Sequence, residues 1–435
     1  MTPFSAIFVP RELREAVSDR SWLQGMLDAE RALARSEAEV GLVAEQAAAQ
    51  IADACRADLY DSELLAEEGR AVGNPAEPLV RALRAEVGPD AADQVHLGAT
   101  SQDIVDTAAM LVARRAVELV LAELDRLAAG CAELARAHRS TPMAARTLLQ
   151  QAVPTTFGLK AAGWLTSTLE ARRRLASVTD ERLAAQLGGA AGTLAALGDR
   201  ALEVVALFAQ ELELVEPSLP WHTDRQRLAE LGAALTSSAG AAAKVGRDIV
   251  LLAQTEVGEV TEAAGGVSST MPQKRNPVRS TVAVACERLA HAHAGVLLGG
   301  LAHEHERAVG GWHAEWEALS GALVFAGAAA AAAADAVEGV EVDAARMRRN
   351  LDASQGLVVA ERVSYALTPR LGRADAHELV AEAARAPSFR DALLADERTG
   401  LTADELDLLL DPATYLGAAE ELVDRALAEY NGALR

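Results

Sequence analysis

The sequence predicts an all-α protein built from long helices, and three observations support that fold class. Residues 99–129, 164–187, 199–216 and 278–294 contain neither glycine nor proline, the residues that most often end a helix. Alanine, leucine, arginine and glutamate dominate the chain while aromatic residues make up only 3%, which favours helix over strand. No stretch shows the sustained two-residue alternation of apolar and polar side chains that is typical of a strand.

Two of these helices can be traced from the spacing of their apolar residues. Within 99–129, apolar side chains recur at steps of three and four residues, as on one face of an amphipathic helix, at Met110, Val117, Val120, Leu121, Leu124 and Leu127. A second long helix is predicted from Leu228, Leu231, Leu235, Val245 and Ile249, with Gly246 tolerated inside it. Helices of roughly 25–35 residues point to a bundle of near-parallel rods.

The chain is expected to divide into three helical domains. Residues 1–106 form the N-terminal domain, and 107–350 form a long-helix bundle that includes a loop at 263–277. Residues 351–435 form a smaller C-terminal domain with turn signals at Pro387, Gly400 and Pro412. The alanine run 328–334 predicts close approach between helices.

Composition excludes several classes of function. A net charge of −22 argues against nucleic-acid binding, which needs basic surfaces. The three widely spaced cysteines suggest reduced thiols, and residues 1–5 show no start of a signal peptide, so a cytoplasmic location is expected. Asp335 and Glu338 closely follow the alanine run, so no membrane span is predicted there.

The most informative segment is the loop at 265–277, Gly-Gly-Val-Ser-Ser-Thr-Met-Pro-Gln-Lys-Arg-Asn-Pro. It combines two adjacent hydroxyls with Lys274, one of only three lysines in a chain that strongly prefers arginine. Such groups suit anion binding and proton transfer. The run 268–277 resembles the signature of the fumarase/aspartase superfamily, homotetrameric enzymes that eliminate across a carbon–carbon bond beside a carboxylate.

This resemblance implies a fold and a set of loop residues. Superfamily members have the same three-part architecture, and four central domains form a twenty-helix core in the homotetramer, with each active site built by three subunits. By position, Ser268 matches the family base, and Lys274 is the second catalytic candidate because it can stabilise the serine alkoxide. Ser269, Met271 and Asn276 are predicted to bind a small polycarboxylate substrate.

A second matching segment runs from His96 to Thr107. Thr100 and Ser101 stand at the start of a predicted helix, where hydroxyls, backbone N–H groups and the helix dipole favour an anion. A plain helix cap is the alternative. The resemblance implies that the threonine and serine hold a substrate carboxylate, and His96 is included as a binding residue.

Further segments supply the remaining binding candidates. In 146–152, Arg146 can clamp a carboxylate through two hydrogen bonds and Gln150 can donate an amide hydrogen bond, although a surface arginine is the alternative. The resemblance also places Asn74, His222, Arg225 and Arg307 at or near substrate.

Leu148 departs from the family pattern, and this departure narrows the reaction. Many members carry histidine there as general acid for the leaving group, and leucine cannot transfer a proton. Expulsion of an amine or hydroxide benefits from such an acid, whereas a leaving carboxylate is already a stable anion. Segments 220–223, 303–316 and 342–351 resemble the branch that lactonises 3-carboxy-cis,cis-muconate, so a cycloisomerase is the predicted function.

Three alternatives remain open from the sequence. A lyase that expels nitrite from nitrosuccinate would tolerate Leu148 equally well. An adenylosuccinate-type lyase would need a different acid for its amine. A relative that has lost catalysis and serves only a structural role would not need the side chains of Ser268, Lys274 and Asn276.

No metal or cofactor is predicted. His291/His293 and His303/His305 are two residues apart, so on a helix their side chains point to different faces. A second departure, Val267 in place of the usual glycine, leaves the mobility of the loop open, although Gly265 and Gly266 precede it.

Overall fold

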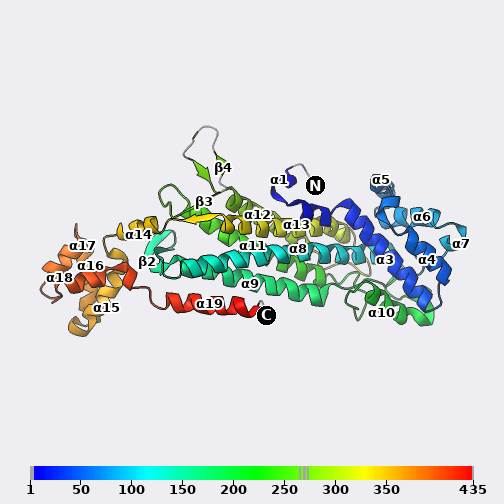
Figure 1. The fold of residues 1–435 in the computed structure, drawn as a ribbon. Coiled ribbons are helices and arrows are strands. Elements are labelled where there is room, and N and C mark those ends of the chain that lie inside the picture. Colours follow the sequence, from blue (N-terminus) through cyan, green and yellow to red (C-terminus); the bar gives the residue numbers. More distant parts are fainter. Residues whose placement is uncertain (1–3, 264–265, 268–270, 272–273, 434–435) are drawn as a thin grey trace. The chain divides into compact units, whose positions relative to one another are not determined.

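The computed structural model describes residues 4–263, 266–267, 271 and 274–433, and these residues form nineteen α-helices and six short strands. The all-α prediction is confirmed. The five longest helices, drawn in Figure 1, are α8 (Ser101–Ala137), α9 (Phe157–Arg182), α11 (Gln226–Leu252), α12 (Val278–Gly299) and α13 (Gly311–Glu338).

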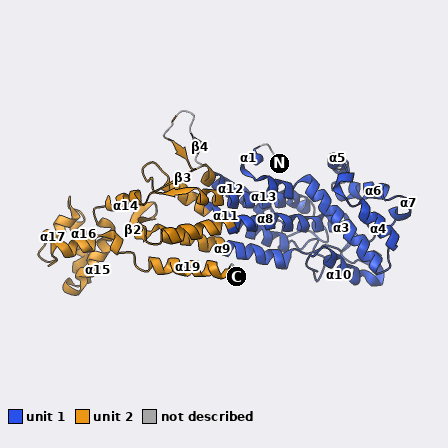
Figure 2. Cartoon of the chain, in the orientation of Figure 1, with its two compact units in different colours: residues 1–125, 170–243, 282–332 blue, residues 126–169, 244–281, 333–435 orange. Residues whose placement is uncertain are grey.

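The chain divides into two compact units, each made of segments that are distant in sequence (Figure 2). Unit 1 comprises residues 1–125, 170–243 and 282–332, and unit 2 comprises 126–169, 244–281 and 333–435. The five longest helices contribute residues to both units. The predicted three-part division at residues 106 and 350 stays a prediction.

Unit 1 holds most of the shorter helices of the N-terminal half: α1 (Ser5–Phe8), α2 (Arg11–Ala16), α3 (Asp19–Glu39), α4 (Glu45–Ala54), α5 (Ser62–Val72), α6 (Ala76–Glu86), α7 (Pro89–Ala92) and α10 (Ala201–Glu211), with short 3-10 turns η1 (Ala57–Leu59) and η2 (Ala195–Arg200). Its core follows the predicted apolar spacing, since Val117, Val120 and Leu124 of α8 are fully buried. Close packing also explains why α13 is rich in alanine. Ala328, Ala329 and Ala330 are fully buried, and a Cβ added at the neighbouring Gly327 would lie 2.6 Å from the end of the Leu13 side chain of α2.

Unit 2 holds all six strands and the C-terminal helices: β1 (Pro142–Thr147), β2 (Gln150–Thr156), β3 (Val260–Glu262), β4 (Gly266–Val267), β5 (Arg275–Asn276), β6 (Val340–Val342), α14 (Ala344–Asp352), η3 (Leu357–Val359), α15 (Ala360–Leu371), α16 (Arg373–Ala383), α17 (Phe389–Ala395), α18 (Ala403–Leu410), η4 (Pro412–Thr414) and α19 (Ala419–Ala433). Helices α15 to α18 share a small core of their own, which includes Val363, Leu379, Phe389 and Leu406.

Three antiparallel strand pairs interrupt the helical pattern in unit 2. Strand β1 pairs with β2, β3 with β6, and β4 with β5. The β1–β2 turn consists of Leu148 and Leu149, which have positive φ values of 51° and 64°. The β4–β5 pair joins Gly266 to Asn276 and Val267 to Arg275, so the backbone on both sides of the 268–274 segment is held together.

Helix α13 is long and apolar enough, by length and composition alone, to cross a membrane. However, 78% of its most apolar window is buried inside the protein, as expected for a core helix. Among the described residues it is the single helix that meets this criterion.

Candidate active site

The predicted site residues fall in both units, so each set is built up within its own unit. In unit 1, the first turn of α8 is fixed by Asp103, whose carboxylate is buried. It accepts hydrogen bonds from the backbone N–H groups of Thr100, Gly188 and Gly189 at 3.0, 3.0 and 2.9 Å. The hydroxyls of Thr100 and Ser101 form no hydrogen bond to another described residue, so both remain available to an anion at this helix start.

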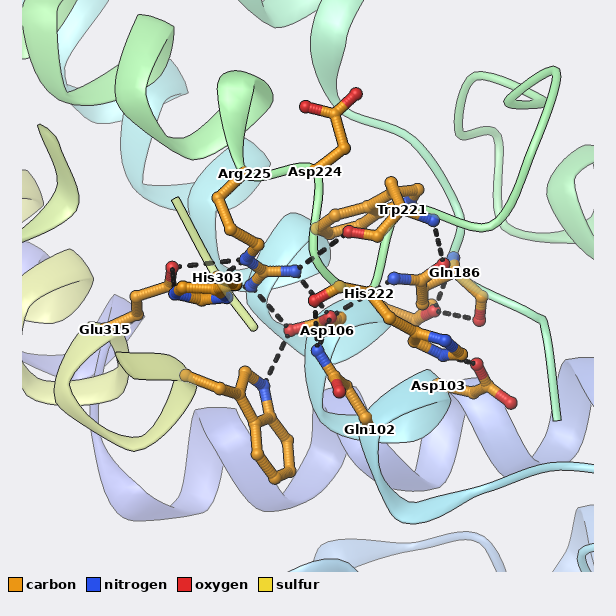
Figure 3. A network of polar contacts seen from close by, with 12 residues as sticks. Gln102, Asp103, Asp106, Gln186, Trp221, His222, Asp224, Arg225, His303 and Glu315 are labelled. Atoms are coloured by element: carbon orange, nitrogen blue, oxygen red, sulfur yellow. Dashed lines mark hydrogen bonds and ion pairs between the residues drawn. The ribbon is translucent and has the colours of Figure 1, made fainter. Parts of the chain in front are cut away.

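The same carboxylate holds His222. The His222 Nε2 atom lies 2.7 Å from Asp103 Oδ1, and only 4% of the residue is exposed. The carbonyl of His222 accepts a hydrogen bond from the Gln102 amide at 2.9 Å. The structure thus brings the 220–225 segment against the start of α8, as Figure 3 shows.

Arg225 lies at the centre of a buried ionic cluster (Figure 3). Its guanidinium donates to Asp106 at 2.8 and 3.0 Å and to Glu315 of α13 at 2.5 Å, and Arg225 is only 1% exposed. Trp312 and Gln102 donate further hydrogen bonds to Asp106. These contacts engage the guanidinium fully and favour a supporting role. Direct substrate binding by Arg225 stays a prediction.

Arg307 lies in the segment between α12 and α13 and is more accessible than Arg225. Its Nη1 donates to the side-chain oxygen of Gln102 at 3.1 Å, and its Nη2 donates to the carbonyl of Ala190 at 3.0 Å. Both acceptors are neutral, so the positive charge of Arg307 has no carboxylate partner among the described residues. Arg307 therefore suits the predicted anion contact better than Arg225 does.

His96 and Asn74 have defined local partners in unit 1. His96 Nδ1 lies 2.6 Å from Glu30 of α3, which is 1% exposed. The Asn74 side-chain oxygen accepts from the backbone N–H groups of Ala76 and Glu77 at 3.1 and 3.0 Å, so it caps α6. Substrate contact by either residue stays a prediction.

In unit 2, Arg146 of β1 already has a carboxylate partner. It donates to both oxygens of the buried Glu259 at 2.9 and 2.7 Å, and Asn350 donates to the same carboxylate at 2.8 Å. Arg146 is therefore paired within the chain while its side chain keeps 21% exposure, and substrate contact by it stays a prediction. A substrate would have to use the donors that Glu259 leaves open, while Gln150 is exposed at the start of β2.

The signature loop is described only in part. Ser268 and Ser269 lie outside the described residues. Lys274 is exposed and its backbone N–H donates to the carbonyl of Met271 at 3.0 Å. The exit of the loop is anchored by Glu262 of β3, which accepts from the backbone N–H groups of Arg279 and Ser280 in the first turn of α12.

Several residues of these networks could not be identified from sequence. Glu30, Glu315 and Glu259 each lie in helix or loop segments with many other acidic residues, and nothing in their spacing distinguishes them. As for metal binding, the described residues contain no group of three or more His, Cys, Asp or Glu side chains arranged to hold an ion.

The long-helix fold, the anion-suited start of α8 and the lysine-bearing loop together define the class of protein. A family model described as lyase matches residues 10–288, and one described as adenylosuccinate lyase C-terminus matches residues 356–426. The chain therefore belongs to this lyase family, the fumarase/aspartase superfamily, and it is an enzyme of that superfamily.

Individual relatives narrow the comparison. The chain is 48% identical to a 3-carboxy-cis,cis-muconate cycloisomerase of Pseudomonas aeruginosa, over 98% of this chain and 96% of the relative. It is also 48% identical to a nitrosuccinate lyase of Streptomyces davaonensis, over 95% of this chain and 91% of the relative. The crystal structure of the 3-carboxy-cis,cis-muconate lactonizing enzyme from Pseudomonas putida superimposes with a TM-score of 0.94 at 45% identity and covers all of both chains.

Proposed function

We propose that this enzyme is a 3-carboxy-cis,cis-muconate cycloisomerase, which forms 4-carboxymuconolactone in the protocatechuate branch of aromatic degradation. The observation that carries the proposal is the similarity to several cycloisomerases over nearly the whole chain. Leu148, an aliphatic side chain where many family members have their general acid, supports it, because a leaving carboxylate needs no proton. We also infer a cytoplasmic homotetramer, as is typical of the superfamily.

In the proposed reaction, one carboxylate oxygen of the substrate adds to a carbon of the diene, and a proton is delivered to the neighbouring carbon. No atom is lost, so the reaction is an isomerisation. Ser268 is the proposed proton donor and acceptor, and Lys274 stabilises its alkoxide. The enolate-like charge that develops next to the substrate carboxylate requires preorganised cations and N–H donors, for which the α8 start and Arg307 are candidates.

The leaving group explains why leucine is compatible with this chemistry. In the reverse direction the lactone opens to a carboxylate, which departs as a stable anion without protonation. The Leu148 side chain is 97% exposed at the β1–β2 turn of the single chain. It offers no proton and no hydrogen bond, so all polar recognition must come from other residues.

The test is a direct assay with 3-carboxy-cis,cis-muconate, following the ultraviolet absorbance of the conjugated diene. We expect rapid loss of absorbance with the wild-type enzyme and none with Ser268→Ala. Ser177→Ala, at an exposed serine of α9, is the matched control and should behave as wild type. Activity of Ser268→Ala near the wild-type rate would eliminate the serine assignment.

The equally similar nitrosuccinate lyase makes nitrite elimination the second candidate. Nitrite is also a stable anion, so Leu148 does not separate the two reactions. Release of nitrite from nitrosuccinate, measured colorimetrically beside the diene assay, separates them. A folded tetramer that releases nitrite but leaves the diene intact would replace the cycloisomerase proposal.

A further inference from the structure

The contact between His96 and Glu30 combines an unusual backbone conformation, a short hydrogen bond and a ring nitrogen that is left without a partner among the described residues. His96 has a positive φ of 64°, a conformation that few residues other than glycine adopt, in the turn that leads to α8. Its Nδ1 atom lies 2.6 Å from Glu30 Oε1, at the short end for a charge-assisted hydrogen bond. The other ring nitrogen, Nε2, forms no hydrogen bond to a described residue, and the side chain keeps 14% exposure.

Glu30 has little other support for a negative charge. Its side chain is 1% exposed, and its second oxygen is buried without a hydrogen-bond partner among the described residues. A buried carboxylate with one partner strongly favours the charged form of that partner. Glu30 therefore needs His96 to carry a proton on Nδ1.

The other charged groups near the imidazole ring do not reverse the effect of Glu30 on the protonation of His96. Burial alone would lower the pKa of His96, but the charge and the hydrogen bond of Glu30 outweigh burial and raise this pKa. Asp103 of α8 also raises the pKa of His96, and Arg84 of α6 lowers it. Glu37, seven residues after Glu30 on α3, is fully buried, and its pKa is raised to about 9 by burial and by Glu30. Glu37 is therefore neutral near pH 7 and does not compete for the histidine.

We propose that Glu30 is a positioning residue of the candidate active site: its buried carboxylate holds the His96 ring as an imidazolium, so that Nε2–H is a fixed cationic donor for one carboxylate of the bound polycarboxylate. His96 stands four residues before Thr100 in the turn that leads into the anion-suited helix start. The proposal rests on the proposed function only for the class of ligand, a small polycarboxylate.

The test compares Glu30→Gln with Glu37→Gln, because both replace a buried carboxylate on the same helix. Binding of propane-1,2,3-tricarboxylate to the tetramer is measured by calorimetry at pH 5.5 and pH 8. At pH 8 the Glu30→Gln variant should bind the tricarboxylate about 10- to 100-fold more weakly than wild type, because it loses a charge-assisted contact. Without Glu30, burial lowers the pKa of His96, so the ring regains its proton only in part at pH 5.5, and the loss of binding there should be smaller than at pH 8. Glu37→Gln should follow wild type at both pH values.

A double variant shows whether Glu30 acts through His96. Glu30→Gln should weaken binding in the wild-type background and have no further effect in a His96→Gln background. Equal losses in both backgrounds, or a loss that does not depend on pH, would overturn the positioning role. Failure of the wild-type enzyme to bind the tricarboxylate would also overturn it. Binding of the tricarboxylate without turnover of the muconate would sink the proposed function alone.

Discussion

The side chains of unit 1 show how a folded chain can bury several charges at once. Arg225 faces two carboxylates, those of Asp106 and Glu315, with all three side chains at most 3% exposed. Such a cluster is stabilised only while every member is present, because loss of one leaves an uncompensated buried charge. Its place beside Gln102 and His222 suggests that it fixes the segments around the start of α8.

We therefore expect Arg225→Leu to lower the free energy of unfolding by about 3–5 kcal/mol, because two buried carboxylates lose their cation. Urea unfolding followed by circular dichroism measures this. The control is Arg11→Leu, which removes an exposed pair with Glu15 and should change little. Similar stabilities for the two variants would contradict the role assigned to the cluster.

Glu37 predicts a pH dependence of stability. In the folded protein its pKa is raised to about 9 by burial, whereas the ordinary value is 4.5. Between these values the folded state holds a proton that the unfolded state has released, so this residue makes stability fall as pH rises. Glu37→Gln removes the effect.

The stability of Glu37→Gln relative to wild type should thus increase from pH 5 to pH 8, by about 1 kcal/mol per pH unit. Thermal or urea unfolding of both proteins across this range provides the measurement. Parallel pH profiles would show that Glu37 is ionised in the folded state.

At the scale of single residues, the sequence suggested part of the candidate site but not the buried acidic residues that hold it in place. Thr100, Ser101 and Arg307 could be proposed from the sequence because they belong to recognisable polar segments, and their contact with substrate stays a prediction. In the sequence, Glu30 and Glu37 look like ordinary charges on a helix surface, because the segment 31–36 between them contains two arginines and a serine. Their burial depends on tertiary packing, which the local pattern of α3 does not encode.

Among the elements, the β1–β2 hairpin has an unusual turn. A two-residue turn with positive φ at both positions normally carries Asn-Gly, because these residues tolerate the left-handed region. Here it carries Leu148 and Leu149, which are 97% and 71% exposed. Both backbone conformation and exposure are unfavourable for leucine, so local stability does not explain their presence.

Replacement of Leu148–Leu149 by Asn-Gly should relax this turn and stabilise the hairpin by about 1–2 kcal/mol. Differential scanning calorimetry of the variant is the measurement. Leu219→Asn is the control, since Leu219 is 77% exposed without a positive φ. A fall in stability instead would mean that the leucines pack against another subunit in the assembled enzyme.

The helices were predictable and the hairpins were not, for identifiable reasons. Apolar spacing located α8 and α11 because their apolar side chains recur at helical steps and are buried, as at Val117, Val120 and Leu235. The glycine-free stretch 164–187 misses the first turns of α9, which begins at Phe157, because Gly158 lies inside the helix. Glycine is required at this position, since a Cβ there would lie 2.6 Å from the carbonyl oxygen of His138. Strand β1 has two adjacent buried residues, Met143 and Ala144, so it lacks the alternation that reveals a strand.

For the whole molecule, we expect a homotetramer with a mass about four times the 45.5 kDa of the chain. Each chain carries a net charge of −22, so subunits repel one another at long range, and apolar contacts must hold the assembly together. Light scattering at low and moderate salt measures the mass. Salt screens the repulsion, so the tetramer should persist to lower protein concentration at moderate salt. A monomer under all conditions would contradict the assembly.

The scarcity of lysine gives the molecule a chemical handle. Lys244 is engaged by Asp248, and the pKa of the partly buried Lys160 is lowered mainly by burial, whereas Lys274 is exposed in the signature loop. An amine-selective acylating reagent thus has three side-chain targets, and peptide mass analysis distinguishes them. The extent of acylation at Lys274, with the other two as internal references, reports occupancy of the loop by any anion without a single mutation.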